Sequence, residues 1–356
     1  MKALWAAPLA LLYGIGVWVR HKMFDWGWLR SQEYDIPIIS VGNLTVGGTG
    51  KTPFTEFLVA RLSPHFRVAV LSRGYQRKSK GYLEVTPKTR TSEAGDEPKQ
   101  IKLKYPNTVV AVCNKRTEGI DRIRAEHPET EVIILDDGFQ HRYVKPWIDV
   151  VLMDYNRPIY RDHLLPWGRL RDRRSQLHRA GFIVVTKCPK DMTPLDRRLV
   201  SKSLTLYPYQ NLYFSVMDTG SLRPIFPAHA SGAPTSGAPV VAMSGIANPA
   251  AFREMLARRY NVVDELIFPD HYAYRKRDIA TMAKLLDDSP DGTAMVITEK
   301  DMVKLAGARK SIPDHIKARL YYLPINVKFY DDSERDFLNR LNYDLRTNPE
   351  NRVLRS

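Results

Sequence analysis

The segment VGNLTVGGTGKT, residues 41–52, combines closely spaced glycines with a lysine and hydroxyl side chains. Because glycines lack side chains, several backbone N–H groups can converge on one anion, and Lys51 can reach the β- and γ-phosphates of a nucleotide. Thr52 offers a hydroxyl oxygen to Mg²⁺. We therefore expect a phosphate-binding loop, whose nucleotide contacts come from Thr45, Val46, Gly47, Gly48, Thr49, Gly50, Lys51 and Thr52.

The neighbours of this loop have the order that a P-loop requires. The apolar run at residues 36–39 predicts a strand, and residues 53–62 are compatible with a helix. The strict pattern places a glycine five positions before Gly50, where this chain has Thr45, and the additional Gly47–Gly48 pair offsets the departure. The alternative, a glycine-rich turn that binds nothing, would not need this strand and helix.

Two adjacent carboxylates, Asp136 and Asp137, follow the apolar run at residues 131–135. A buried strand that ends in aspartate is the usual partner of a P-loop, because Mg²⁺ needs a second anionic oxygen near the nucleotide. We expect Thr52 to bind Mg²⁺ together with Asp136 or Asp137, and both acids are candidates.

Arginines are concentrated at residues 166–174, PWGRLRDRR. Guanidinium groups bind phosphoryl oxygens bidentately, so this segment is a candidate for contacts with a phosphorylated ligand. Some of these arginines are expected to be ordinary surface charge.

The remaining apolar runs predict the elements that position these residues. Strands are expected at residues 67–71, 108–113, 149–154 and 181–186, and their alternation with helices favours a P-loop NTPase-like, mostly parallel sheet between helices. The pattern resumes at residue 240, which indicates a smaller α/β domain. We expect an N-terminal membrane-associated helix (1–30), a P-loop nucleotide-binding domain (31–210), a strand and linker region (211–239), the smaller domain (240–340) and a tail (341–356).

Composition limits the classes of partner. The chain has 356 residues, of which 44% are hydrophobic, and a formal net charge of +15. Such an excess of positive charge suits binding to nucleic acid, to an anionic membrane or to a phosphorylated substrate. Zinc-finger spacing, RNP-like motifs and long basic runs are absent from the sequence, so nucleic acid is not an expected partner. Cys113 and Cys188 are far apart and are expected to be free thiols in a reducing compartment.

The N-terminal segment resembles a membrane helix. Residues 3–19 are largely apolar and are followed by Arg20, His21 and Lys22. This length reaches about 25 Å as a helix, against about 30 Å for a hydrocarbon core, so spanning is marginal. The basic cluster follows the apolar run, unlike that of a secretory signal. We expect an uncleaved anchor that holds the protein at the cytoplasmic side of a membrane. The alternative is a buried amphipathic helix.

The motifs, in this order, resemble the tetraacyldisaccharide 4′-kinase family, the lipid A 4′-kinases of Gram-negative bacteria. The resemblance covers nearly the whole chain. It is carried by VGNLTVGGTGKTP (41–53), SRGY (72–75), GDEP (95–98), LDDGFQHR (135–142), LPWGRLRD (165–172), SGIANP (244–249), FPDHY (268–272) and ITEKD (297–301).

The resemblance implies a reaction, a fold and partners. The γ-phosphoryl group of ATP would be transferred, with Mg²⁺, to the 4′-hydroxyl of a tetraacylated glucosamine disaccharide 1-phosphate. The fold would be a P-loop α/β sandwich joined by a strand linker to a smaller α/β domain, with the active site in the cleft. The expected partners are this lipid and the anionic cytoplasmic face of the bacterial inner membrane, and we expect a monomer.

The resemblance also implies roles for individual residues. Lys51 would act on the phosphates, Asp96 would be the general base, His271 would orient it from the second domain, and Arg171 would meet charge on the transferred group. Asp172 stands where the family usually has glutamate, so a metal contact there would come from a side chain one methylene shorter. The alternative for Asp96 is capping of its loop.

Two other classes of protein fit the sequence less well. A GTPase needs a guanine-binding motif, and the nearest candidate, at residues 186–189, has Pro189 in the position of the required aspartate. A non-catalytic membrane ATPase would not need the acidic loop around Asp96, the arginine segment and the Asp270–His271 pair.

Overall fold

The computed structural model describes residues 6–230, 232–246, 248–270 and 272–347. In this part of the chain, nine strands form the larger sheet, in the order β14-β8-β7-β6-β1-β5-β2-β4-β3. Neighbouring strands are parallel except at β3–β4 and β8–β14. The predicted mostly parallel α/β sheet is therefore confirmed. The strands are β1 Ile38–Asn43, β2 Val68–Ser72, β3 Leu83–Glu84, β4 Val109–Val112, β5 Val132–Asp136, β6 Ile148–Asp154, β7 Phe182–Thr186, β8 Asn211–Thr219 and β14 Ile325–Phe329.

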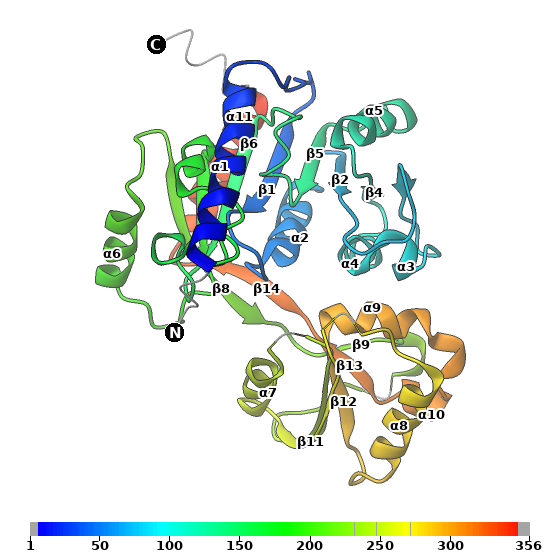
Figure 1. Ribbon diagram of the computed structural model, residues 1–356. Helices are drawn as coiled ribbons and strands as arrows, with labels where there is room; N and C mark the ends of the chain where they lie inside the picture. The colour runs from blue at the N-terminus through cyan, green and yellow to red at the C-terminus, as the bar shows by residue number, and fades with distance from the viewer. Residues whose placement is uncertain (1–5, 231, 247, 271, 348–356) are drawn as a thin grey trace.

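Helices cover both faces of this sheet (Figure 1). Successive strand residues point to opposite faces, so Ile39 belongs to one core and Ile38 to another. The first core contains side chains of α2 (Lys51–Leu62), α4 (Asp96–Lys104) and α11 (Ser333–Arg346). The opposite face is covered by α5 (Arg116–Glu126) and α6 (Pro194–Leu204). Shorter helices are α3 Thr91–Ala94 and the 3-10 turns Ile159–Arg161, Arg174–Arg179, Pro227–His229 and Arg309–Ser311.

A second α/β unit lies beside the large domain and is connected to it by β8 and β14 (Figure 1). Its described strands form a five-stranded sheet in the order β11-β10-β12-β13-β9, parallel except at β9–β13. The elements are β9 Arg223–Pro224, β10 Pro239–Ser244, α7 Pro249–Ala257, β11 Asn261–Ile267, α8 Lys276–Asp287, β12 Ala294–Thr298, α9 Glu299–Gly307, α10 Asp314–Lys317 and β13 Leu320–Leu323.

The boundaries of the two domains differ from those expected. β8 lies in the region expected to hold a strand and a linker, and it pairs with β7 as a strand of the large sheet. β14 pairs with β8, and α11 places Phe337, Leu341 and Leu345 in the core of the large domain. The chain thus returns to the large domain before residue 340. The apolar spacing of α11 marks it as a helix but does not show which core it completes.

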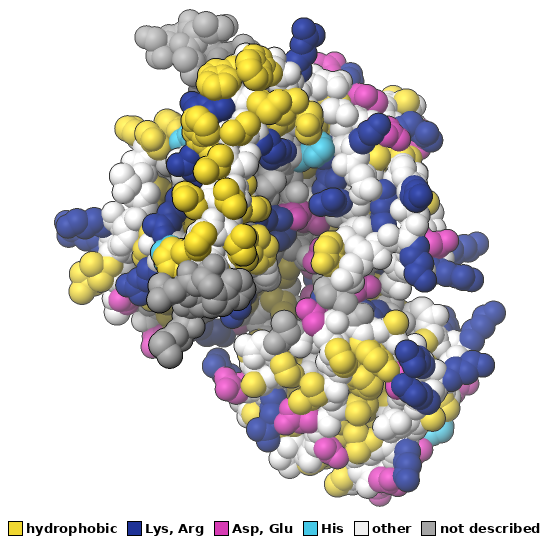
Figure 2. All heavy atoms as spheres, viewed as in Figure 1, with side chains coloured by type: hydrophobic (Ala, Val, Ile, Leu, Met, Phe, Trp, Pro, Cys, Tyr) yellow, Lys and Arg dark blue, Asp and Glu magenta, His cyan; other side chains and the backbone are white. Residues whose placement is uncertain are grey.

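Helix α1 (Ala6–Asp25) lies against the segment at residues 162–174, where Tyr13 Oη donates a hydrogen bond to the Arg171 carbonyl at 2.8 Å. Its opposite side is apolar and open to solvent, and Figure 2 shows hydrophobic side chains gathered along it. None of the described helices is long and apolar enough to cross a membrane. The exposed apolar side chains of α1 are Leu9, Leu11, Leu12, Ile15, Trp18 and Val19.

Candidate active site

The predicted phosphate-binding loop, residues 45–52, runs from β1 into the start of α2. Asn43 at the end of β1 donates a side-chain hydrogen bond to Thr49 Oγ1 at 2.8 Å. Gly47 and Gly50 have φ of 108° and 86°, left-handed conformations that favour glycine. Since α2 begins at Lys51, the free N–H groups of its first turn lie at this loop, which is the arrangement that binds an anion.

A neighbouring strand holds the loop from the other side. Thr186 at the end of β7 donates through Oγ1 to the Thr49 carbonyl at 2.8 Å. Lys187, the next residue, contacts the Gly48 carbonyl and lies 2.8 Å from Asp154 Oδ2. Lys187 was not expected in this site from the sequence. Its position directly after a buried strand was the available signal.

The two acids at the end of β5, Asp136 in the strand and Asp137 directly after it, have different surroundings. Asp136 is 1% exposed and accepts hydrogen bonds from Thr55 and Ser72, each at 3.3 Å. Burial, together with the charge of Asp137, raises the pKa of Asp136. Asp137 has a left-handed backbone conformation, with φ of 53°. Its Oδ1 lies 3.6 Å from Lys51 Nζ. Although its burial acts in the opposite direction, the hydrogen bond from Arg171 and the charge of Lys51 lower the pKa of Asp137 to about 2.

Arg171 points into the same site. Its guanidinium donates to Asp137 Oδ2 at 3.0 Å and to Asn43 Oδ1 at 2.6 Å. These contacts fix the guanidinium group between Asn43 at the end of β1 and Asp137 directly after β5. Arg171 is therefore adjacent to the phosphate-binding loop, where the resemblance placed it.

Asp172, which we expected as a metal ligand, lies in a different environment from Asp136 and Asp137. The carboxyl is 1% exposed and accepts a hydrogen bond from His21 Nε2 at 2.7 Å. Arg142 donates to His21 Nδ1 at 3.0 Å, so Nε2 carries the proton that His21 donates. Arg171 and Asp172 lie in a bend that follows the isolated bridge between Leu170 and Thr45, and their side chains have different partners. Asp172 thus attaches α1 to the arginine segment.

Asp96 is the first residue of α4 and follows Gly95, which has φ of 91°. The SRGY and GDEP loops are in contact here, since a Cβ on Gly74 would lie 2.8 Å from the Ala94 carbonyl oxygen. Asp96 Oδ2 lies 3.7 Å from Lys304 Nζ of the smaller domain. His271 lies outside the described residues, and its neighbour Asp270 contacts Lys300 at 2.9 Å.

Two further charged residues belong to this site and were not expected from the sequence. Burial and the charge of Asp136 raise the pKa of Glu97 to about 7, against the opposing charge of Lys51. Arg116 is 2% exposed and donates to the Cys113 carbonyl at 2.8 Å, and burial lowers its pKa to about 10. Arg116 starts the helix after β4, so its place at the end of a parallel strand could have indicated it.

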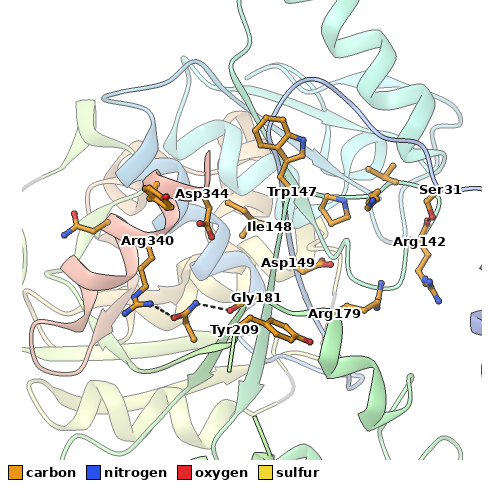
Figure 3. A pocket seen from close by; sticks show the side chains of 16 residues that line it. Ser31, Arg142, Trp147, Ile148, Asp149, Arg179, Gly181, Tyr209, Arg340 and Asp344 are labelled. Carbon is orange, nitrogen blue, oxygen red and sulfur yellow. Dashed lines mark hydrogen bonds between the residues drawn. The ribbon is translucent and has the colours of Figure 1, made fainter. Parts of the chain in front are cut away.

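A large cavity lies at the opposite edge of the sheet, where the parallel strands begin. It measures about 920 Å³ and is lined by Asp149, Gly181 and Asn211, at the starts of β6, β7 and β8 (Figure 3). Burial raises the pKa of Asp149 to about 6. Parallel sheets bind ligands at the carboxyl ends of their strands, so we assign the active site to the edge with the phosphate-binding loop.

The fold, together with the phosphate-binding loop at the carboxyl ends of the parallel strands, defines a P-loop nucleotide-binding protein of the α/β class. Residues 2–343 match the family described as Tetraacyldisaccharide-1-P 4′-kinase. The chain is 45% identical over 353 residues to a tetraacyldisaccharide 4′-kinase of Phocaeicola vulgatus, covering 98% of this chain and 96% of the relative. It is 43% identical to one of Porphyromonas gingivalis, covering 95% and 96%.

A solved structure has the same fold. The crystal structure of LpxK from Aquifex aeolicus in complex with ATP superimposes with a TM-score of 0.72 at 29% identity, covering 95% of this chain and 97% of that one. The chain described here belongs to the tetraacyldisaccharide 4′-kinase family.

Proposed function

We infer that the protein is an ATP-dependent kinase of lipid A biosynthesis, which transfers the γ-phosphoryl group of ATP to the 4′-hydroxyl of a tetraacylated glucosamine disaccharide 1-phosphate. The observation that carries this conclusion is the convergence of the phosphate-binding loop, Asp136, Asp137 and Arg171 at one edge of the sheet. The relatives are named for this activity, and the Aquifex aeolicus structure holds ATP. The direct test is incubation with ATP and the tetraacyldisaccharide 1-phosphate, in which a doubly phosphorylated lipid is expected.

The oxygen donors near Lys51 suit Mg²⁺, which takes one or two protein carboxylates and completes its shell with water and phosphate oxygens. Among the described residues, no group of three or more His, Cys, Asp or Glu side chains could hold a metal ion. Thr52, Asp136 and Asp137 are the side chains that we propose for the ion. When bound, Mg²⁺ would neutralise phosphate charge, and its charge would favour the ionised form of Asp136.

The chain's own residues supply positioning and charge. The N–H groups at the start of α2 and the Lys51 ammonium would bind the phosphates, and Arg171 would meet charge on the transferred group. We propose that Asp96 accepts the proton of the attacking 4′-hydroxyl and that His271 orients Asp96 from the smaller domain. A sugar hydroxyl is a weak nucleophile, so a nearby carboxylate helps mainly as the new bond to phosphorus forms.

We further propose that α1 lies against the anionic cytoplasmic face of the inner membrane. Its solvent-facing side is a row of large apolar side chains, and Trp26 and Trp28, directly after it, are also exposed. Tryptophan and apolar side chains beside basic residues are typical of helices that lie in the membrane interface. A hollow of about 370 Å³ between α1 and residues 162–174 is lined by Leu11, Trp167 and Arg174, and it could receive part of the acylated substrate.

A further inference from the structure

Helices α4 and α9, one from each domain, are joined by ion pairs at both ends. Lys104, the last residue of α4, lies 2.8 Å from Glu299, the first residue of α9, and 2.6 Å from Glu56 on α2. At the other end, Asp96 of α4 pairs with Lys304 of α9 at 3.7 Å. The helices therefore run antiparallel, and both pairs cross the domain boundary.

Lys304 is held in place by its own domain. Its side chain is 8% exposed, and Nζ lies 3.2 Å from Asp301 and 5.8 Å from the centre of the Tyr274 ring. Asp301 is fully buried and accepts hydrogen bonds from Gly245 N at 2.7 Å and Thr298 Oγ1 at 2.6 Å. The Lys304 ammonium group is thus held by Asp301, which is itself fixed by the loop after β10 and the start of α9. These contacts within the smaller domain position Lys304 beside Asp96.

We propose that Lys304 is a positioning residue for phosphoryl transfer, which orients the carboxylate of Asp96 from the smaller domain. The proposal rests on the proposed role of Asp96 as the base. A cation enclosed beside a carboxylate limits rotation of the acid, because the ion pair favours one orientation of its oxygens. Because Lys304 is anchored in one domain and Asp96 in the other, the base is aligned only when the two domains hold this arrangement.

The test compares Lys304→Met with Lys304→Arg in the full-length enzyme, using ATP and the tetraacyldisaccharide 1-phosphate. Lys304→Met should lower kcat by about 10- to 100-fold, the range that a small misplacement of a reacting group causes, and should leave KM for ATP unchanged. Lys304→Arg keeps the charge and should restore most of kcat. The matched control is Lys317→Met, which removes another buried lysine of the same domain, paired with Asp314 at 2.8 Å.

A double-mutant cycle makes the test specific for Asp96. In the Asp96→Asn background, Lys304→Met should cause little further loss, because residues that act as a unit are non-additive. Equal kcat values for Lys304→Met and Lys317→Met, multiplicative losses, or a change in KM for ATP alone would overturn the proposal. If circular dichroism shows that Lys304→Met is unfolded, Lys304→Gln replaces it. Normal turnover by Asp96→Asn would instead refute the proposed base, and with it the role of Lys304.

Discussion

At the scale of single residues, the active site consists of like charges held close together by a few cations. Asp136, Asp137 and Glu97 lie around Lys51, and each acid responds differently to burial and neighbours. Asp137 is kept ionised by Arg171 and Lys51, whereas burial and neighbouring carboxylates favour the protonated forms of Asp136 and Glu97. Such opposed surroundings are typical of functional sites that bind a cation, since its positive charge relieves the repulsion among the carboxylates.

Lys51→Ala should abolish phosphoryl transfer and leave the fold intact. Lys51 contacts Asp137 at 3.6 Å with its side chain 17% exposed, so its removal opens no core cavity. Loss of one preorganised charge contact to the phosphates should lower kcat by at least about 10²-fold. The control is Lys190→Ala, which removes a lysine that is 65% exposed and paired with Asp218. Near-normal turnover by a folded Lys51→Ala enzyme would contradict the P-loop assignment.

Glu97→Gln should make the nucleotide-free protein more resistant to urea at pH 8. Burial and Asp136 raise the pKa of Glu97 to about 7, above an unfolded value of about 4.3. The stability linked to its proton is therefore complete below about pH 4.3 and is lost as pH rises through 7. The gain in urea midpoint should be largest at pH 8 and smaller at pH 5. A gain that is equal at both pH values would show that Glu97 is not the group responsible.

At the scale of elements, α1 has two different faces. One face is bound to the catalytic loops through Tyr13 and the buried His21–Asp172 pair, and the other exposes a row of apolar side chains. Membrane contact through the second face would therefore bring lipid close to the arginine segment that carries Arg171. Such contact would explain why an apolar helix precedes a nucleotide-binding domain in the same chain.

Leu9→Asp combined with Leu12→Asp should weaken binding to anionic vesicles and leave kcat on detergent-dispersed substrate unchanged. Both side chains are exposed, at 48% and 65%, so the charges disturb the outer face of α1 and no core. The matched control carries Leu195→Asp and Leu199→Asp on α6, which are 65% and 55% exposed. Vesicle co-sedimentation measures the effect. Equal binding by the two double variants would exclude α1 as the membrane contact.

At the scale of the whole molecule, the chain leaves the large domain through β8 and returns through β14. These two strands are antiparallel neighbours, so the smaller domain is an insertion supported by a pair of strands. After the return, α11 fills the large core with Phe337, which is fully buried and surrounded by the rings of Phe54, Phe57, Phe182, Tyr213 and Phe329. The last helix thus packs against α2, which begins at Lys51.

Phe337→Ala should destabilise the large domain by about 3–5 kcal/mol, the usual cost of removing a buried phenylalanine. Tyr343→Ala, on the same helix but 57% exposed, should have little effect. Urea unfolding followed by tryptophan fluorescence measures both variants. If Phe337→Ala and Tyr343→Ala both caused only a small change in the free energy of unfolding, α11 would not be part of this core.

The sequence by itself determined the parts of the protein that depend on local chemistry. A phosphate-binding loop needs its glycines, lysine and threonine close together in the sequence, so it was visible in one short segment. Asp136 and Asp137 directly follow a run of apolar residues, so they were visible in the same way. The mostly parallel sheet followed from the alternation of strands and helices. The arginine segment was visible because guanidinium groups are concentrated in it, and the resemblance to the family singled out Arg171 within it.

Only the tertiary structure decided which distant residues meet. His21 and Asp172 are 151 positions apart, and their hydrogen bond joins α1 to the arginine segment. Lys304 reaches Asp96 across the domain boundary, and β14 returns to pair with β8. Such contacts depend on which strands and helices become neighbours. Periodicity shows which face of an element is buried, but the partner of that face is selected by the fold as a whole.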